Sequence, residues 1–199
     1  MADDINLLLI DAASDGDHEG IVQLLALGAY PLHCASFALC RAAKHGHAEC
    51  VKLLIPVSDP KADKSRALRW AARRGNAECA KLLIPHSNPK ADNSGALCWA
   101  AAKGHADCVS LLMSVSAPSK ADRSKAFLLA VESGHAECVR LLHEPRLLGH
   151  LDLPAVLATA TAKGQSELAL LISSIVEKGT FEAHLPRPLP GNAPTPRRL

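Results

Sequence analysis

The apolar residues of this chain recur with helical spacing in short segments that are separated by glycine and by turn-forming residues. In "ALRWAARRGNAECAKLLIP", residues 67–85, one helix face is formed by positions i, i+3 and i+4: Leu68, Ala71 and Ala72. The second half of the segment, "AECAKLL", repeats this spacing. The pattern predicts a helix over about 65–74, with Asp63 or Ser65 as its N-cap, and a second helix over about 77–84 that ends at Pro85.

The segment is one copy of an internal repeat. Its central glycine recurs at six positions with steps of 29 or 30 residues: Gly16, Gly46, Gly75, Gly104, Gly134 and Gly164. A fixed period of this size indicates a solenoid. A helix pair with two short apolar faces cannot bury them alone, so neighbouring pairs must stack and share a continuous core. We therefore expect an all-α protein of about six stacked helix-turn-helix units.

Three copies, "LRWAARRGNAECAKLL", "LCRAAKHGHAECVKLL" and "LLAVESGHAECVRLL", resemble the ankyrin repeat. The resemblance covers about residues 5–175 and implies an ankyrin-like solenoid whose function is to bind another protein. The chain departs from the family in two respects: the Thr-Pro-Leu-His motif is missing, and the period is shorter than the usual 33 residues. The missing residues fall between repeats, so we expect shortened inter-repeat loops in place of a projecting hairpin.

The repeats divide the chain into an expected repeat domain, residues 1–177, and a tail, residues 178–199. The expected repeats are approximately 1–30, 31–60, 61–89, 90–119, 120–149 and 150–177. The tail contains "LPRPLPGNAPTPRRL", which is rich in proline, basic and without helical periodicity. Such a composition predicts disorder.

Composition narrows the classes of protein to consider. Lys and Arg number 22 against 20 Asp and Glu, and aromatic residues make up only 3% of the chain, so nothing overall demands nucleic acid. The N-terminus is acidic rather than basic and no apolar run approaches the roughly 20 residues of a membrane span, so we expect neither a signal peptide nor membrane insertion. We expect a cytoplasmic monomer with reduced thiols.

The cysteines and histidines of the repeat invite a metal or catalytic interpretation, but a structural one fits better. Four cysteines share one repeat position that is apolar in ankyrin repeats: Cys50, Cys79, Cys108 and Cys138. Packed helices lie 8–10 Å apart, too far for disulfides between neighbours, and a linear ladder offers no converging zinc ligands. The histidines that follow the repeat glycine are replaced by Asn76 in one unit, which a shared catalytic role would not permit. We predict no enzyme activity, no cofactor and no metal; Cys34 is the thiol we expect to react most readily.

A polar stripe is the candidate binding site. Trp70, Arg73 and Arg74 share a helix face about 200° away from the apolar face. Equivalent positions in the neighbouring units extend this stripe to eight residues: Arg41, Lys44, His45, Trp70, Arg73, Arg74, Trp99 and Lys103. Asp11 and Asp15 flank it on one side and Glu132 on the other. By resemblance, the residues before the glycine line a concave groove that contacts partners.

The charge distribution suggests what the stripe binds. Residues 1–40 carry six acidic residues and no Lys or Arg, whereas residues 41–104 carry 12 basic residues against 5 acidic ones. Trp and Arg are also enriched at binding hot spots. We expect a non-enzymatic interaction module that binds a partner with an acidic surface. Three alternatives stay open: the charged middle could be merely a solvated surface, it could bind nucleic acid, and the tryptophans could be additional core rather than surface.

Overall fold

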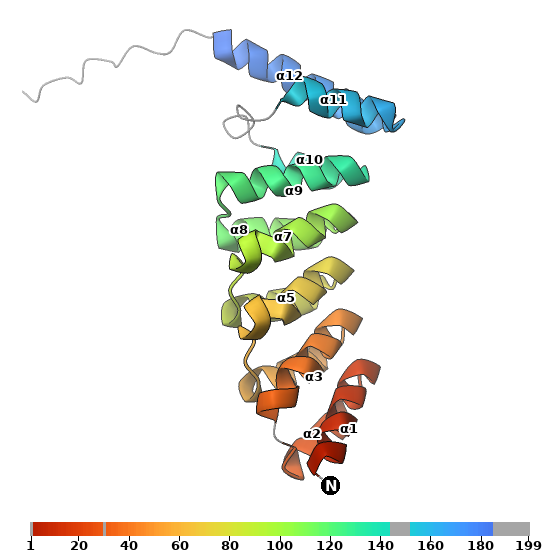
Figure 1. The fold of residues 1–199 in the computed structure, drawn as a ribbon, viewed down its shortest axis with the longest axis vertical. Coiled ribbons are helices and arrows are strands. Elements are labelled where there is room, and N and C mark those ends of the chain that lie inside the picture. Colours follow the sequence, from red (N-terminus) through yellow and green to blue (C-terminus); the bar gives the residue numbers. More distant parts are fainter. Residues whose placement is uncertain (1, 30, 144–151, 185–199) are drawn as a thin grey trace, which may run out of the picture.

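The computed structural model describes residues 2–29, 31–143 and 152–184, and the described residues form twelve α-helices and two short 3-10 helices (Figure 1). The α-helices fall into six consecutive pairs: α1 (Ala2–Asp15) with α2 (His18–Ala26), α3 (Pro31–His45) with α4 (Ala48–Leu54), α5 (Ala62–Arg74) with α6 (Ala77–Leu83), α7 (Ala91–Lys103) with α8 (Ala106–Ser116), α9 (Lys120–Ser133) with α10 (Ala136–Leu142), and α11 (Leu153–Ala162) with α12 (Ser166–His184). The expected all-α solenoid of stacked pairs is confirmed.

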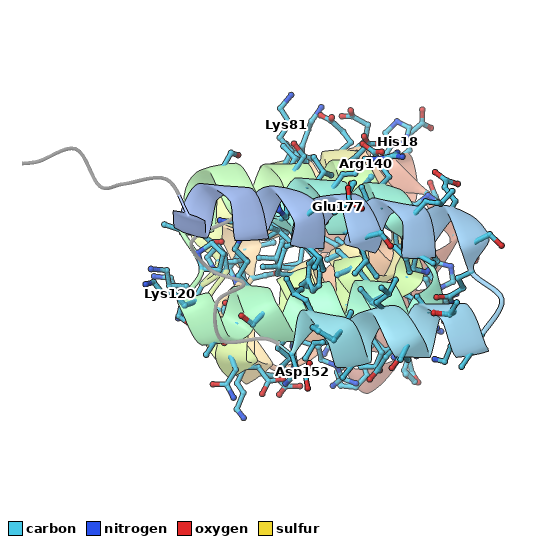
Figure 2. All side chains as sticks on the ribbon, turned by 90° about the horizontal axis from the view of Figure 1, so that it is seen from above. His18, Lys81, Lys120, Arg140, Asp152 and Glu177 are labelled. Carbon is cyan, nitrogen blue, oxygen red and sulfur yellow. The ribbon has the colours of Figure 1, made fainter. Side chains whose placement is uncertain are left out.

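The pairs stack so that their helices form two layers (Figures 1 and 2). The first helices of successive pairs, α1, α3, α5, α7 and α9, contact one another in order, and the second helices, α2, α4, α6, α8 and α10, do the same. The last pair continues both layers, because α11 contacts α9 and α12 contacts α10. Equivalent repeat positions therefore come side by side along one layer.

Short connections rather than projecting hairpins follow α4, α6 and α8. The described residues contain no strand; α4 and α6 each lead instead into a 3-10 helix, η1 (Ile55–Val57) and η2 (Ile84–His86). Pro85 lies in the first turn of η2 and ends α6, as the sequence predicts. None of the helices in the described part of the chain is both long and apolar enough to cross a membrane.

Two expectations about helix boundaries need correction. Neither Asp63 nor Ser65 is the N-cap of α5: both have left-handed backbone angles, and the Ser65 hydroxyl accepts a hydrogen bond from the backbone N–H of Asn88 in the next unit at 2.8 Å. The boundary expected between the repeat domain and the tail at residue 178 falls inside α12, which continues to His184. Residues 185–199 of the expected tail lie outside the described residues.

The core consists of small aliphatic side chains and cysteines, as the apolar spacing predicts. Leu68, Ala71 and Ala72 are completely buried. The four cysteines of the shared repeat position are buried in a continuous row with the same core, and all are free thiols. Small residues at these positions allow the helices of neighbouring units to approach closely.

The turn between the two helices of a unit is tied to the preceding unit by the residue after the repeat glycine. His105 Nε2 donates a hydrogen bond to the carbonyl oxygen of Arg73 at 3.1 Å, and His47 Nε2 does the same to Ser14 at 3.0 Å. Asn76 donates from Nδ2 to the carbonyl oxygens of Ala43 and Lys44 at 2.8 and 3.0 Å. An asparagine thus satisfies the same helix end as the histidines, which supports their structural interpretation.

The buried thiols predict a dependence of stability on pH. Burial raises the pKa of Cys79 and of Cys108 to about 11, whereas a thiol in an unfolded chain ionises near 8.5. Between about pH 9 and 11 the unfolded chain therefore releases protons that the folded chain retains. The free energy of unfolding falls as the pH rises through this range. Below about pH 8 these thiols are protonated in both states and do not change it.

Cys79→Ala tests this dependence. We expect it to lower the free energy of unfolding by about 1 kcal/mol at pH 7.5 and to reduce the further loss between pH 7.5 and 10. Urea denaturation at the two pH values measures both effects. An unchanged loss between the two values would contradict the burial of this thiol. The side chain of Cys34 lies outside the described residues, so its expected reactivity remains a prediction. The denaturation experiments are therefore made in a Cys34→Ser background, which removes this thiol.

Candidate partner-binding site

The eight residues predicted as a stripe lie on three neighbouring helices of the first layer. Helix α3 carries Arg41, Lys44 and His45, helix α5 carries Trp70, Arg73 and Arg74, and helix α7 carries Trp99 and Lys103. Because α3 contacts α5 and α5 contacts α7, the three groups are adjacent. We call the surface formed by these eight residues the first-helix face.

Four of these residues form a row of cation–aromatic contacts. The Arg73 guanidinium lies 4.4 Å from the ring centre of Trp99 and 5.0 Å from that of Trp70, so it bridges two units. The ammonium of Lys44 lies 5.3 Å from the Trp70 ring and adds a third unit to the row. Contacts at these distances are attractive and restrict the side chains involved. The first-helix face therefore presents ordered cations and aromatic rings.

The two tryptophans differ in their surroundings. Trp70 is half-buried and packs against the core, whereas Trp99 is 39% exposed. The sequence leaves open whether the tryptophans are core or surface, and the two differ: Trp70 extends the core and also borders the surface, whereas Trp99 belongs mainly to the surface. The large exposed ring at Trp99 is available to a partner.

Two of the predicted residues have additional or different roles. Arg41 Nε donates a hydrogen bond to the Ser14 hydroxyl of the preceding unit at 3.0 Å, so this side chain also links two units. Desolvation and the neighbouring charges of Lys44 and Arg41 lower the pKa of His45 from its usual value near 6.5. His45 is therefore neutral at pH 7 and adds no positive charge to the face at that pH.

The cations at the ends of these helices also interact favourably with the helix dipole, which offers a purely structural explanation for them. The fold does not require basic residues at these helix ends, however, because the last turns of α1 and α9 contain none. The same positions hold Ser14 and Asp15 in α1 and Glu132 and Ser133 in α9. The fold accepts neutral or acidic residues there, so the basic residues of α3, α5 and α7 distinguish the middle units.

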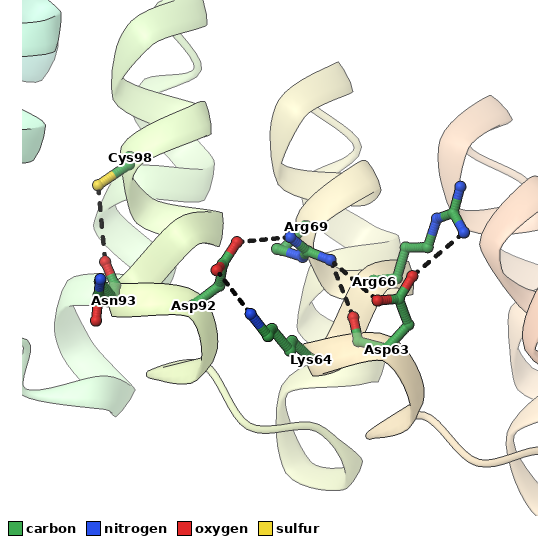
Figure 3. A network of polar contacts seen from close by, with 7 residues as sticks. All are labelled: Asp63, Lys64, Arg66, Arg69, Asp92, Asn93 and Cys98. Carbon is green, nitrogen blue, oxygen red and sulfur yellow. Dashed lines mark hydrogen bonds and ion pairs between the residues drawn. The ribbon is translucent and has the colours of Figure 1, made fainter.

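A network of ion pairs that sequence analysis missed lies at the opposite ends of α5 and α7 (Figure 3). Arg69 Nη1 is 2.7 Å from Asp92 Oδ2, and Arg69 Nη2 donates to the carbonyl oxygen of Asp63 at 2.9 Å. Arg66 pairs with Asp63 at 3.2 Å, and Lys64 lies 3.5 Å from Asp92. Acidic residues thus neutralise the basic ones here, whereas no ion pair among the described residues involves Arg73, Arg74 or Lys103.

Two left-handed turns present these aspartates. Residues 63–65 have φ values of 47°, 55° and 58°, and residues 92–94 have 56°, 52° and 55°. Such angles are costly for residues other than glycine and are maintained by surrounding contacts. The "KAD" at 61–63 and at 90–92 ends in the first residue of each turn, but the same three residues at 120–122 lie in α9 without left-handed angles. The motif alone therefore does not indicate a left-handed backbone.

Three cavities follow the first-helix face from α3 to α9. The cavity between α3 and α5 measures about 470 Å³, the next, between α5 and α7, about 390 Å³, and the third, between α7 and α9, about 300 Å³. Trp70 borders the first two and Trp99 borders the second and third. The face is therefore a hollowed surface on which aromatic rings divide successive depressions.

The chemistry available here favours binding. Burial raises the pKa of Cys40, in the wall of the first cavity, to about 12, so its thiol is neutral at pH 7 and a poor nucleophile. Among the described residues, no group of three or more histidine, cysteine and carboxylate side chains could hold a metal ion. What the site offers is charge and aromatic surface.

Comparison with known proteins agrees with the repeat pattern. The family model described as ankyrin repeats (3 copies) matches residues 9–93 and also residues 68–150, which together span well over half of the chain. No curated protein matches the sequence. Ankyrin repeats are generally protein–protein interaction modules and typically have no enzyme activity.

Proposed function

The chain belongs to the ankyrin-repeat family, and from this premise we propose that it is a non-enzymatic module that binds an acidic surface of another protein through its first-helix face. The observation that carries the proposal is the position of Arg73 between the rings of Trp70 and Trp99. This arrangement orders a basic side chain and two large rings before any partner arrives. Less conformational entropy is then lost on binding.

The basic part of the first-helix face is bounded by acidic residues, which supports a partner whose acidic surface is small. The basic residues occupy the three middle units, while Asp11, Asp15 and Glu132 lie at the equivalent helix faces on either side. A nucleic acid presents a long, uniform row of phosphates. Here the basic residues occupy only three units and acidic residues bound them on both sides. A compact acidic surface of a protein fits this distribution better.

The proposal includes a reducing compartment such as the cytoplasm. The six described cysteines are free and buried, and persistent free thiols are typical of proteins from reducing environments.

Charge reversal tests the binding face. We expect the double variant Arg74→Glu, Lys103→Glu to weaken binding of the captured partner at least about tenfold, because both residues are exposed and a like charge would face the acidic surface. The matched control is Lys52→Glu, Lys81→Glu, which changes the net charge equally on the second-helix layer. Affinity is measured by titration with the partner identified by mass spectrometry, and melting temperatures check that both variants fold.

The control separates the binding face from net charge. Equal weakening by both double variants would attribute binding to overall charge, and full affinity in the Arg74, Lys103 variant would place the partner elsewhere. A salt series distinguishes nucleic acid, because contacts with many phosphates give a steep linear fall of log affinity with log salt concentration.

A further inference from the structure

The cavity between α3 and α5 has features that the general binding face does not explain. Its volume is about 470 Å³, and two aromatic side chains, Phe37 and Trp70, contribute to its walls. Three basic residues, Arg41, Lys44 and Arg66, also line it, against one acidic residue, Asp63, which pairs with Arg66. Volumes of this size are typical of sites that enclose a ligand group rather than of packing defects.

Phe37 is the residue that makes this cavity distinctive. Its side chain is 53% exposed, which is unusual for a phenyl ring in a chain with so few aromatic residues. The equivalent repeat position holds a different residue type in each of four other units: Leu7, Arg66, Gly95 and Lys125. The fold therefore does not require an aromatic residue at this position. Exposed apolar surface with a basic rim is instead typical of an interaction site.

Contacts within the protein hold the basic groups in place. The Arg66 guanidinium lies 5.3 Å from the centre of the Phe37 ring and also pairs with Asp63 at 3.2 Å. The Lys44 ammonium lies at the same distance from the Trp70 ring. Each aromatic wall thus carries a cation that leaves little freedom to either group.

We infer that this cavity anchors an aromatic side chain of the partner, within a short segment whose neighbouring residues are acidic. The inference rests on the proposed function and assigns the part of the partner that is recognised. A flat ring can pack against Phe37, Trp70 and the planar Arg66 guanidinium in stacked or edge-to-face geometry. Cys40, a neutral thiol in the same cavity, adds a small apolar contact.

The dimensions of the face indicate where the acidic residues lie. Packed helices are about 8–10 Å apart, and an extended peptide advances about 3.3–3.6 Å per residue. Arg74 lies eight residues after Arg66 on α5, about 12 Å along the helix axis, so a carboxylate about three or four residues from the anchored ring reaches it. Lys103 lies one helix further, on α7. Carboxylates adjacent to the ring reach Arg41 and Lys44 on α3.

A set of three labelled peptides tests the inference. The probe is a fluorescein-labelled heptapeptide with phenylalanine flanked on each side by three glutamates; a second peptide has alanine in place of phenylalanine, and a third has glutamine in place of glutamate. Fluorescence anisotropy with the full chain should show about tenfold tighter binding of the phenylalanine peptide than of the alanine peptide. The glutamine peptide should bind at least about tenfold more weakly than the probe.

Phe37→Ala should reduce the affinity for the phenylalanine peptide to that for the alanine peptide, and leave the alanine peptide unaffected. Leu7→Ala is the matched control, because it truncates an exposed side chain at the equivalent position of the first unit and should change neither affinity. Melting temperatures of both variants should stay close to that of the wild type, since both side chains are exposed.

Equal affinity for the phenylalanine and alanine peptides would overturn the anchoring role of the cavity, and so would a preference for the phenylalanine peptide that survives Phe37→Ala. In both cases, binding of the acidic peptides would still support the proposed function. Binding of a twelve-residue oligouridylate but of none of the acidic peptides would overturn both. If no probe binds, the anchoring inference is overturned, and the charge-reversal experiment with the captured partner decides the proposed function separately.

Discussion

Leu68→Ala should lower the free energy of unfolding by about 2–5 kcal/mol, enough to unfold a large part of a marginally stable chain. Leu68 is completely buried in the middle of the first-helix layer, where α5 packs between α3 and α7. Each unit of a solenoid depends on its neighbours, so a cavity in a central unit weakens two interfaces at once. Urea denaturation followed by circular dichroism at 222 nm measures the loss.

The control for this prediction is the same truncation at the surface. Leu7 is 61% exposed, and Leu7→Ala should change the free energy of unfolding by no more than about 0.5 kcal/mol. Similar effects of the two substitutions would show that the first-helix layer is not packed as described.

Gly75→Ala should cost about 2–5 kcal/mol, from two separate causes. Gly75 has φ of 77°, a left-handed conformation that disfavours any side chain by about 1–2 kcal/mol. A Cβ atom there would also lie 2.5 Å from Nδ1 of His105, so the imidazole must move and its hydrogen bond to the Arg73 carbonyl would be disturbed. An unsatisfied helix end adds about 1–3 kcal/mol. Chemical denaturation gives the total.

Gly164 provides a matched control for the backbone term. It occupies the same repeat position with φ of 69°, but a Cβ atom there would meet nothing within 4 Å. Gly164→Ala should therefore cost only the backbone strain. In a His105→Ala background, Gly75→Ala should fall to the cost of Gly164→Ala. A cost that stays unchanged in that background would exclude the clash with His105 as a cause.

The sequence predicted the fold well because each feature recurs in several units. The glycine spacing located the turns, and the i, i+3, i+4 positions identified core residues such as Leu68 that the structure buries completely. Less regular features were harder. The left-handed turns at Asp63 and Asp92 depend on contacts between units, so local capping preferences gave the wrong interpretation of Asp63 and Ser65.

The candidate site was predicted only in outline. Helical geometry places Trp70 and Arg73 on one face, and the structure brings them into contact. The insertion of Arg73 between two rings, and the link from Arg41 to Ser14, depend on side-chain conformations that the repeat pattern does not specify. Phe37 was missed because no other unit has an aromatic residue at that position, although this irregularity was itself the available signal.

Hydroxyl-radical footprinting of the complex with the captured partner tests the binding face most directly. Trp99 and Phe37 are exposed on the first-helix layer, whereas Val22 and Leu170 are exposed on second helices. Binding on the first-helix face should protect Trp99 and Phe37 from oxidation and leave the rates at Val22 and Leu170 unchanged. Unchanged oxidation of Trp99 and Phe37, with protection of Val22 or Leu170, would contradict the proposed binding face.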